Sequence, residues 1–223
     1  MRALLLAALL AASGGRAGAS EIPGAVIVLE AAPGTPGSDP AGAPPRFVLL
    51  KDGQVFVGGT SLVEAGRLER SEAQALAKRS AALRKLPGIG APLAFGGASD
   101  RVVRLSVLEG DPLEIVATGD PARAPAVLTP LTTFLDELEH FRHPTLRPYA
   151  PASYALSVRE AKLAGGCRAW GFPVPLAEAL AGRRTVAALD ATSWPTGALP
   201  ASVCVDERRY SVTLRPLLPG EHP

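Results

Sequence analysis

The sequence predicts an α+β fold in which antiparallel β-hairpins carry two amphipathic helices on one face and a disulfide-closed subdomain follows at the C-terminus. Three observations predict it. Two apolar runs of β-forming residues flank the turn dipeptide Asp52-Gly53. Two later stretches repeat apolar residues at helical spacing. The last third of the chain holds both cysteines, Cys167 and Cys204.

Residues 1–19 have the pattern of a cleavable signal peptide. Arg2 supplies a positive charge, the run from Ala3 to Ala12 is apolar, and Ala17-Gly18-Ala19 has the small residues that signal peptidase reads. The apolar run covers about ten residues, whereas a spanning helix needs about twenty. A membrane anchor and a buried helix are the alternatives. We therefore expect cleavage between Ala19 and Ser20, a secreted or periplasmic location, and no transmembrane segment in the mature chain.

Removal of this segment changes the charge of the chain. The full sequence of 223 residues has 23 basic and 21 acidic residues, a formal net charge of +2. Arg2 and Arg16 are the only charged residues of the segment, so 23 minus 2 leaves 21 basic residues against 21 acidic ones. A nucleic-acid partner would leave a strong basic excess. We therefore expect no nucleic-acid partner.

The mature chain divides into three parts. Residues 20–45 are expected to hold a short strand, Ala25 to Leu29, and a linker, because Ala32 to Pro45 contains five prolines and three glycines. Residues 46–150 are expected to form a hairpin–helix–hairpin–helix domain. Residues 151–223 are expected to form a β-rich subdomain.

The first hairpin lies in RFVLLKDGQVFVGG, residues 46–59. We expect a two-residue turn at Asp52-Gly53. The resulting pairs are Leu50 with Val55 and Val48 with Val57 on one face, and Leu49 with Phe56 on the other. Both faces are apolar, so we expect both to be covered. An exposed apolar patch around Phe47, Leu49 and Phe56 would favour a binding function.

Two stretches predict the amphipathic helices. The first covers residues 71–86 and starts with a capping box of Ser71 and Gln74. The second is expected to be capped by Thr129, with Pro130 at its first helical position. The apolar stripes are Ala73, Leu76, Leu83 and Leu86 in the first helix, and Leu131, Phe134, Leu138 and Phe141 in the second.

Further strands follow from alternation of apolar residues. A second hairpin between the helices has Val103, Leu105 and Val107 on one strand and Leu113, Ile115 and Ala117 on the other. Near the C-terminus, Tyr154 to Val158 and Arg209 to Leu214 alternate like strands, and Pro175 to Ala181 is expected to be a short helix.

Cys167 and Cys204 are the two cysteines of the chain. In an exported protein such a pair indicates a disulfide, which here closes a loop of 38 residues. Two free thiols or one nucleophilic cysteine are the alternatives. A nucleophile needs a histidine partner, and the one histidine that follows Cys167 is the penultimate residue, His222.

The segment DELEHFRHP, residues 136–144, gathers three carboxylates and two histidines. On a helix, His140 falls opposite the apolar stripe, close to Asp136 and Glu137. An i,i+4 pair of Asp136 and His140 at a helix end accounts for the pattern without a ligand. A surface zinc site at Asp136, Glu137 and His140 is the alternative. We expect no cofactor.

The candidate binding residues are aromatic. Trp170 and Phe172 lie in a proline-flanked loop that ends at Pro175, and Trp194 follows. No nucleophile elbow, zinc-protease motif or phosphate loop occurs in the sequence. We therefore expect a non-enzymatic binding module whose partner is another envelope protein or a small ligand. The alternatives are an inhibitor of a secreted hydrolase, acting through the loop, and a metal-dependent enzyme.

The C-terminal run WPTGALPASVCVDERRYSVTLRPLLPGE, Trp194 to Glu221, is similar to the endings of a family of uncharacterised secreted bacterial proteins. Those endings share a tryptophan, a polar turn, a strand with a tyrosine and an R-P-L-L-P-x-E tail. Here these features are Trp194, Tyr210 and Arg215 to Glu221. The resemblance implies an exported protein and carries over no activity, cofactor or site residue.

Overall fold

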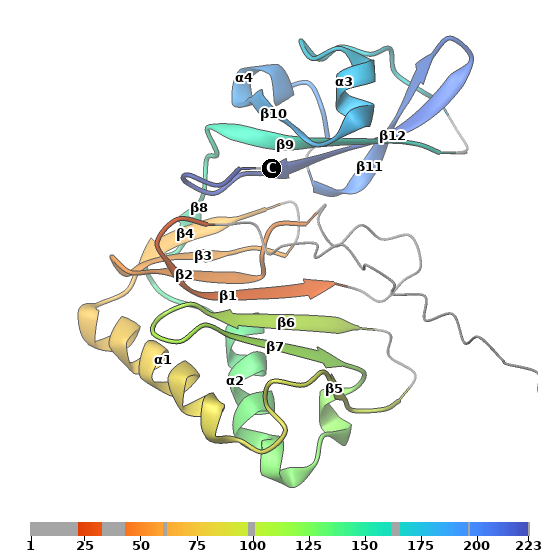
Figure 1. The fold of residues 1–223 in the computed structure, drawn as a ribbon. Coiled ribbons are helices and arrows are strands. Elements are labelled where there is room, and N and C mark those ends of the chain that lie inside the picture. Colours follow the sequence, from red (N-terminus) through yellow and green to blue (C-terminus); the bar gives the residue numbers. More distant parts are fainter. Residues whose placement is uncertain are drawn as a thin grey trace, which may run out of the picture.

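The computed structural model describes residues 22–32, 43–59, 62–97, 101–161, 166–195 and 197–222. The predicted signal peptide, residues 1–19, and the middle of the predicted linker lie outside them. The chain forms a mixed α+β structure in layers (Figure 1). Helices α1 (Arg70–Ala82) and α2 (Thr129–Glu139) lie on one side of a large sheet, and the C-terminal subdomain lies on the other. The predicted α+β class is confirmed.

The large sheet has eight strands in the order β5-β7-β6-β1-β2-β3-β4-β8. They are β1 (Ala25–Ala32), β2 (Phe47–Leu50), β3 (Gln54–Val57), β4 (Glu64–Arg67), β5 (Leu93–Ala94), β6 (Val102–Val107), β7 (Leu113–Thr118) and β8 (Arg147–Pro148). Neighbouring strands are antiparallel except the short parallel pair β5 and β7. Since β1 pairs with both β2 and β6, the two hairpins share one sheet.

Strand β1 is covered on both faces of the sheet. Ile27 and Leu29 belong to the hydrophobic cluster on the helix side, and Val28 belongs to a second cluster on the opposite side. The run AVIVL has no polar residue between its apolar ones, as expected for a strand buried on both faces. The strand predicted from this run therefore lies in the middle of the sheet.

The first hairpin has a register one residue away from the predicted one. Its Cα partners are Phe47 with Val57, Val48 with Phe56, and Leu49 with Val55. The loop has three residues, Lys51 to Gly53, and Gly53 has a φ of 83° and donates its N–H to the Leu50 carbonyl at 3.0 Å. A three-residue loop with a left-handed glycine is a common hairpin. The predicted two-residue turn is wrong, because the extra loop residue places Leu49 rather than Leu50 opposite Val55.

One hydrophobic cluster joins the helices to the sheet. Its buried members from the predicted helical stripes are Leu76, Leu83, Leu131, Phe134 and Leu138, and its buried members from the strands include Ile27, Leu29, Phe47, Leu49, Leu105 and Ile115. Ala73, Leu86 and Phe141 are partly buried at its margin. The alternation predicted for β6 and β7 is confirmed by the burial of Val103, Leu105, Val107, Ile115 and Ala117.

Helix α1 starts with a different cap from the one predicted. Glu69 is the N-cap and Glu72 completes the capping box, with the Glu69 N–H donating to the Glu72 carboxylate at 2.8 Å. The predicted box of Ser71 and Gln74 is wrong. The reason is tertiary, because the residue before the cap, Leu68, is buried and donates its N–H to the Gly53 carbonyl. After Ala82 the chain tightens into a 3₁₀ turn instead of continuing the helix.

Helix α2 also begins differently from its prediction. Leu128 is the N-cap, and Thr129 is the first helical residue. The Thr129 hydroxyl donates to the Ala126 carbonyl at 2.7 Å, so it completes the preceding 3₁₀ turn instead of capping α2. Thr129 is therefore not the cap, and Pro130 is the second helical residue instead of the first, still within the first turn where proline is tolerated.

The C-terminal subdomain is built on a second, four-stranded sheet in the order β10-β9-β12-β11. Its elements are β9 (Ser153–Glu160), α3 (Leu176–Ala181), β10 (Arg184–Ala187), α4 (Ala188–Ala191), β11 (Gly197–Val205) and β12 (Arg208–Pro216). The three elements predicted in this region, two strands and a short helix, correspond to β9, β12 and α3. The subdomain has a hydrophobic cluster of its own.

The C-terminal tail connects the subdomain to the large sheet. Leu218 packs in the cluster that covers the second face of the large sheet, with Ile22, Ala25, Val28, Val48, Phe56 and Val63. The Tyr149 hydroxyl donates to the Leu217 carbonyl at 3.2 Å. Glu221 accepts the Leu218 N–H at 2.9 Å and pairs with Arg215 at 2.8 Å, and both charged side chains are almost fully buried. The tail is therefore clamped by apolar packing and by a buried ion pair.

Replacement of Glu221 by glutamine should strongly destabilise the protein. The change removes the carboxylate that pairs with the buried Arg215 guanidinium, and removing one partner of a buried pair costs about 3–5 kcal/mol. Urea unfolding of Glu221→Gln against wild type measures the loss. Glu178→Gln, an exposed glutamate on α3, is the matched control and should lie within about 0.5 kcal/mol of wild type. Equal stability of the two variants would show that the pair does not hold the tail.

Glu30 on β1 should make stability depend on pH. Burial raises the pKa of Glu30 above its ordinary value of 4.5, although Arg104, 3.6 Å away, lowers it. The folded protein therefore binds this proton more tightly than the unfolded chain, and the contribution of Glu30 to stability falls as pH rises from the ordinary pKa through the raised one. As pH rises from 4 to 7, the free energy of unfolding should fall less for Glu30→Gln than for wild type. Parallel stability curves in urea titrations would contradict this.

Candidate functional site

The predicted binding residues Trp170, Phe172 and Trp194 lie together in the C-terminal subdomain. Phe172 stacks on Trp194 with ring centroids 4.3 Å apart, and Trp170 meets Phe172 edge-on at 5.1 Å. Phe172 and Trp194 are buried in the subdomain's hydrophobic cluster, and Trp170 is partly buried against it. Of the three side chains, Trp170 is therefore the most accessible to a partner. Phe172 and Trp194 pack inside the subdomain and hold the loop in place.

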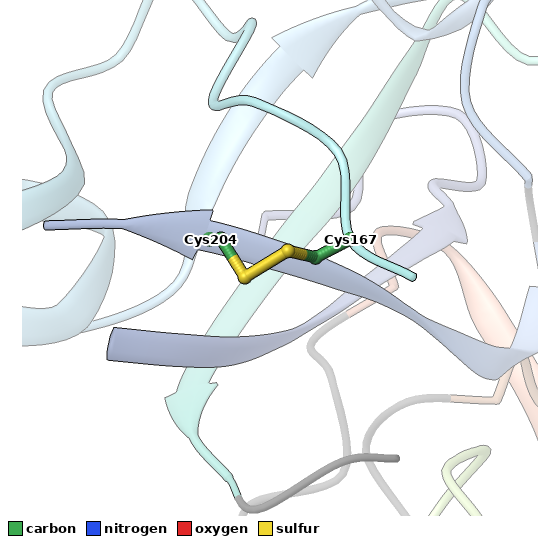
Figure 2. The surroundings of a disulfide bond; sticks show 2 residues. All are labelled: Cys167 and Cys204. Atoms are coloured by element: carbon green, nitrogen blue, oxygen red, sulfur yellow. A yellow bond between two sulfur atoms is a disulfide. The ribbon is translucent and has the colours of Figure 1, made fainter. Parts of the chain in front are cut away.

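The predicted disulfide between Cys167 and Cys204 is confirmed, with an S–S distance of 2.02 Å. Figure 2 shows it joining the loop that carries Cys167 to β11, which carries Cys204. The next residue, Arg168, donates its N–H to the Ser202 carbonyl at 3.0 Å and accepts the Cys204 N–H at 2.9 Å. Its guanidinium lies 5.9 Å from the centre of the Trp194 ring. The loop is thus held along the edge of β11 by covalent, backbone and side-chain contacts.

The segment with clustered acids and histidines lies at the exposed end of α2. The predicted Asp136–His140 pair is confirmed at 3.0 Å, with side chains 75% and 68% exposed. Glu137 pairs instead with Arg79 of α1, with one hydrogen bond of 2.8 Å. Within the described part of the chain, no group of three or more His, Cys, Asp or Glu residues is placed to hold a metal ion. The structure therefore does not bring Asp136, Glu137 and His140 together as one ligand set.

A buried carboxylate that the sequence analysis missed lies beside this segment. Glu139 is buried and pairs with Arg101, and its backbone carbonyl accepts from Arg46 Nε at 2.7 Å. The sequence holds one signal for this burial: Glu139 follows Leu135 by four residues, which places both on the buried side of α2. Next to it, Arg101, Asp136 and other residues line a cavity of about 50 Å³. That space holds a few water molecules and is far smaller than a typical substrate pocket.

A larger hollow lies between α1 and the turn that joins β6 to β7. Its volume is about 550 Å³. Ala77 and Ala81 are one helical turn apart on α1, and their small side chains leave room beside the buried Val107 of β6. The remaining lining residues are Gln74, Lys78, Arg84, Glu109, Gly110 and Asp111. We call this hollow the α1 groove.

The rim of the α1 groove carries charges of both signs. Lys78 lies on the helix wall, and Glu109 and Asp111 lie on the turn. Arg84 bridges the two walls, because its guanidinium donates to the carbonyls of Glu109 and Asp111. Leu108, in the same turn, is 43% exposed. An apolar floor inside a charged rim is the usual organisation of a protein-binding surface.

The apolar faces of the first hairpin do not provide such a surface. Phe47, Leu49 and Phe56 are buried, because the helices cover one face of β2 and β3 and the tail covers the other. The coverage expected for both faces is confirmed. The α1 groove is therefore the stronger candidate for a binding surface.

Comparison with known proteins gives no match to a family model, a curated protein or a solved structure. The similarity of the C-terminal run to uncharacterised secreted proteins therefore stays a prediction. Among the helices of the described residues, none is long and apolar enough to cross a lipid bilayer.

Removal of the disulfide should destabilise the protein by about 4 kcal/mol, because the reduced unfolded chain is no longer constrained by the loop. The double variant Cys167→Ala/Cys204→Ala measures this in urea without reductant. The emission of Trp170 and Trp194 should shift, since both rings belong to the cluster beside the bridge. Wild type unfolded in the presence of dithiothreitol is the control and should match the variant. A variant as stable as oxidised wild type would refute the expectation.

Proposed function

We propose that the protein is an exported, non-enzymatic binding module of the cell envelope that recognises a protein partner through the α1 groove. The observation that carries the proposal is the form of the groove, an open hollow of about 550 Å³ with an apolar floor and a charged rim. The predicted signal peptide supports export. The disulfide supports it too, because such bonds persist in oxidising compartments outside the cytosol.

The floor of the groove suits one apolar side chain of a partner. Ala77, Ala81 and Val107 would surround such a side chain and remove it from water, as at the centre of a protein interface. On the rim, Glu109 and Asp111 favour a basic residue of the partner, and Lys78 favours an acidic one. The groove thus selects a segment with an apolar anchor between charges of opposite sign.

The groove is held rigid before any partner binds. The capping box at Glu69 secures the start of α1, burial of Leu76 secures its inner face, and burial of Leu83 secures the 3₁₀ turn that follows it. The ion pair of Arg79 with Glu137 ties α1 to α2, consistent with the predicted packing of both amphipathic helices on one face. A preorganised surface loses little conformational entropy on binding, which favours affinity.

A second candidate function is inhibition of a secreted hydrolase, and the anchoring of the disulfide loop favours it. Cys167 and Arg168 fix the start of the loop, and the burial of Phe172 fixes its middle. The Trp170 indole N–H donates to the Val174 carbonyl at 2.9 Å, which closes the loop on itself. Such a loop could enter an enzyme's cleft without being ordered first. Inhibition that Trp170→Ala abolishes would identify this function.

Filling the α1 groove should prevent partner binding without unfolding the protein. Ala81 is exposed at the groove, so Ala81→Trp places a large ring where the partner's apolar side chain would lie. The mature, oxidised protein is cross-linked in its native envelope, and the attached protein is identified and quantified by mass spectrometry. We expect the yield of the specific adduct to fall by about tenfold or more.

The matched control is Ala75→Trp, on an exposed part of α1 outside the groove lining. It should capture the partner as wild type does. Equal capture by both variants would place the interface elsewhere. Recovery of the monomer or a homo-oligomer alone, from wild type, would count against a binding module.

A further inference from the structure

The geometry points to a second binding site, for a phosphate ester, in a hollow beside β4 and β8. The hollow has a volume of about 360 Å³, and its lining residues are Glu64, Arg142, His143, Pro144, Leu146 and Arg147. We call it the arginine hollow. It shares no lining residue with the α1 groove. The proposal therefore goes beyond the proposed function and does not depend on it.

Within the described residues, neither guanidinium group of the arginine hollow forms an ion pair with a carboxylate. Arg147 Nη1 donates to the carbonyls of Pro144 and Leu146 at 2.8 and 2.7 Å. Arg142 Nη1 donates to the Phe141 carbonyl at 2.8 Å. A guanidinium has five N–H donors, so most of the donors on both side chains remain for a ligand. Both side chains are exposed, and their hydrogen bonds to carbonyls of their own segment leave the positive charge of each guanidinium in place.

The segment that carries both arginines is anchored to β4. The Thr145 hydroxyl accepts the Arg67 N–H at 3.1 Å and donates to the Arg67 carbonyl at 3.0 Å. This close approach requires a glycine on β4, because a Cβ on Gly66 would lie 2.7 Å from Thr145 Oγ1. Burial of Leu146 fixes the next residue. The backbone between the two arginines is therefore fixed against β4 before a ligand binds.

The wall between the arginines is fixed as well. The His143 ring lies parallel to that of Phe141, with centroids 6.3 Å apart, and its Nδ1 is 2.7 Å from Thr145 Oγ1. Its Nε2 is 3.4 Å from a carboxylate oxygen of Glu72 at the start of α1. His143 is thus held by partners on both nitrogens, and the two arginines remain the groups available to an anion.

The chemistry of the lining favours an ester over a free anion. Guanidinium groups bind tetrahedral oxyanions through paired, charge-assisted hydrogen bonds, and two of them suit the charge of a phosphate. Glu64 also lines the arginine hollow and would repel an inorganic anion that filled it. A phosphate ester with a neighbouring hydroxyl avoids this conflict, because the hydroxyl can donate to Glu64. The preferred ligand is a phosphate ester of a hydroxylated small molecule, free or as a lipid headgroup.

Calorimetric titration of the mature, oxidised protein tests the site, with glycerol 3-phosphate, inorganic phosphate and glycerol as probes at low salt. We expect binding of glycerol 3-phosphate to be tighter than that of phosphate by about fivefold or more, and no binding of glycerol. Vesicles with and without phosphatidylglycerol form a second arm. Binding of the soluble ester identifies a free ligand, whereas binding of the anionic vesicles alone, lost in the arginine variants, identifies a headgroup.

Variants separate a built site from diffuse attraction between charges. Arg147→Gln and Arg142→Gln should each weaken glycerol 3-phosphate binding by about tenfold or more, and Arg147→Lys should give an intermediate loss because it keeps charge without the planar fork. The control is Arg123→Gln, at an exposed arginine outside the hollow, which should bind as wild type does. Because Arg147→Gln and Arg142→Gln each test the site, the experiment remains decisive if one of the two variants misfolds. Equal weakening by the control and by both hollow variants would overturn the proposal, and so would a wild type that binds neither glycerol 3-phosphate nor the vesicles with phosphatidylglycerol.

Discussion

The structure depends on the need to cover both faces of the large sheet around β1. Ile27 and Leu29 turn to the helices, while Val28 and its neighbours Val48 and Phe56 form an apolar surface on the other side. Left in water, that second surface would be an exposed apolar patch of the kind that drives aggregation. The chain covers it with its own C-terminal tail, where Leu218 completes the cluster. Folding of the last third of the chain is therefore coupled to the first strand.

The tail combines two physical effects with different roles. Apolar burial of Leu218 supplies favourable free energy, because it removes the side chain from water. The buried pair of Arg215 and Glu221 has to overcome the desolvation of both charges, so its main contribution is to fix where the tail lies. The same face continues from Val28 to Glu30, whose pKa is affected by both Arg104 and Arg215. Charges from both parts of the chain thus meet between the two sheets.

The proposed surfaces lie on parts of the fold that this core leaves free. The α1 groove exists because Ala77 and Ala81 are too small to fill the space beside Val107. The arginine hollow exists because the chain between α2 and β8 is held close to β4 at Gly66. In both places buried neighbouring residues anchor the backbone. The side chains that face outward are mainly alanines and charged side chains. Substitutions of the outward-facing residues of the two surfaces should therefore cost the fold little stability.

The sequence by itself determined which residues are apolar on each element, because periodicity of two or of 3.6 is a local property. It correctly predicted the buried faces of β6 and β7, the buried stripe residues Leu131, Phe134 and Leu138, and the disulfide, which follows from cysteine number and expected compartment. Only the tertiary structure decided which residues contact one another. The hairpin register depended on the left-handed Gly53, and the cap of α1 depended on the anchoring of Leu68. The Glu139 carboxylate found its partner in Arg101, and its backbone carbonyl found one in Arg46, 93 residues away. The local spacing places Glu139 on the buried side of α2, but contacts of that separation are set by how whole elements pack, so no local pattern encodes the partners.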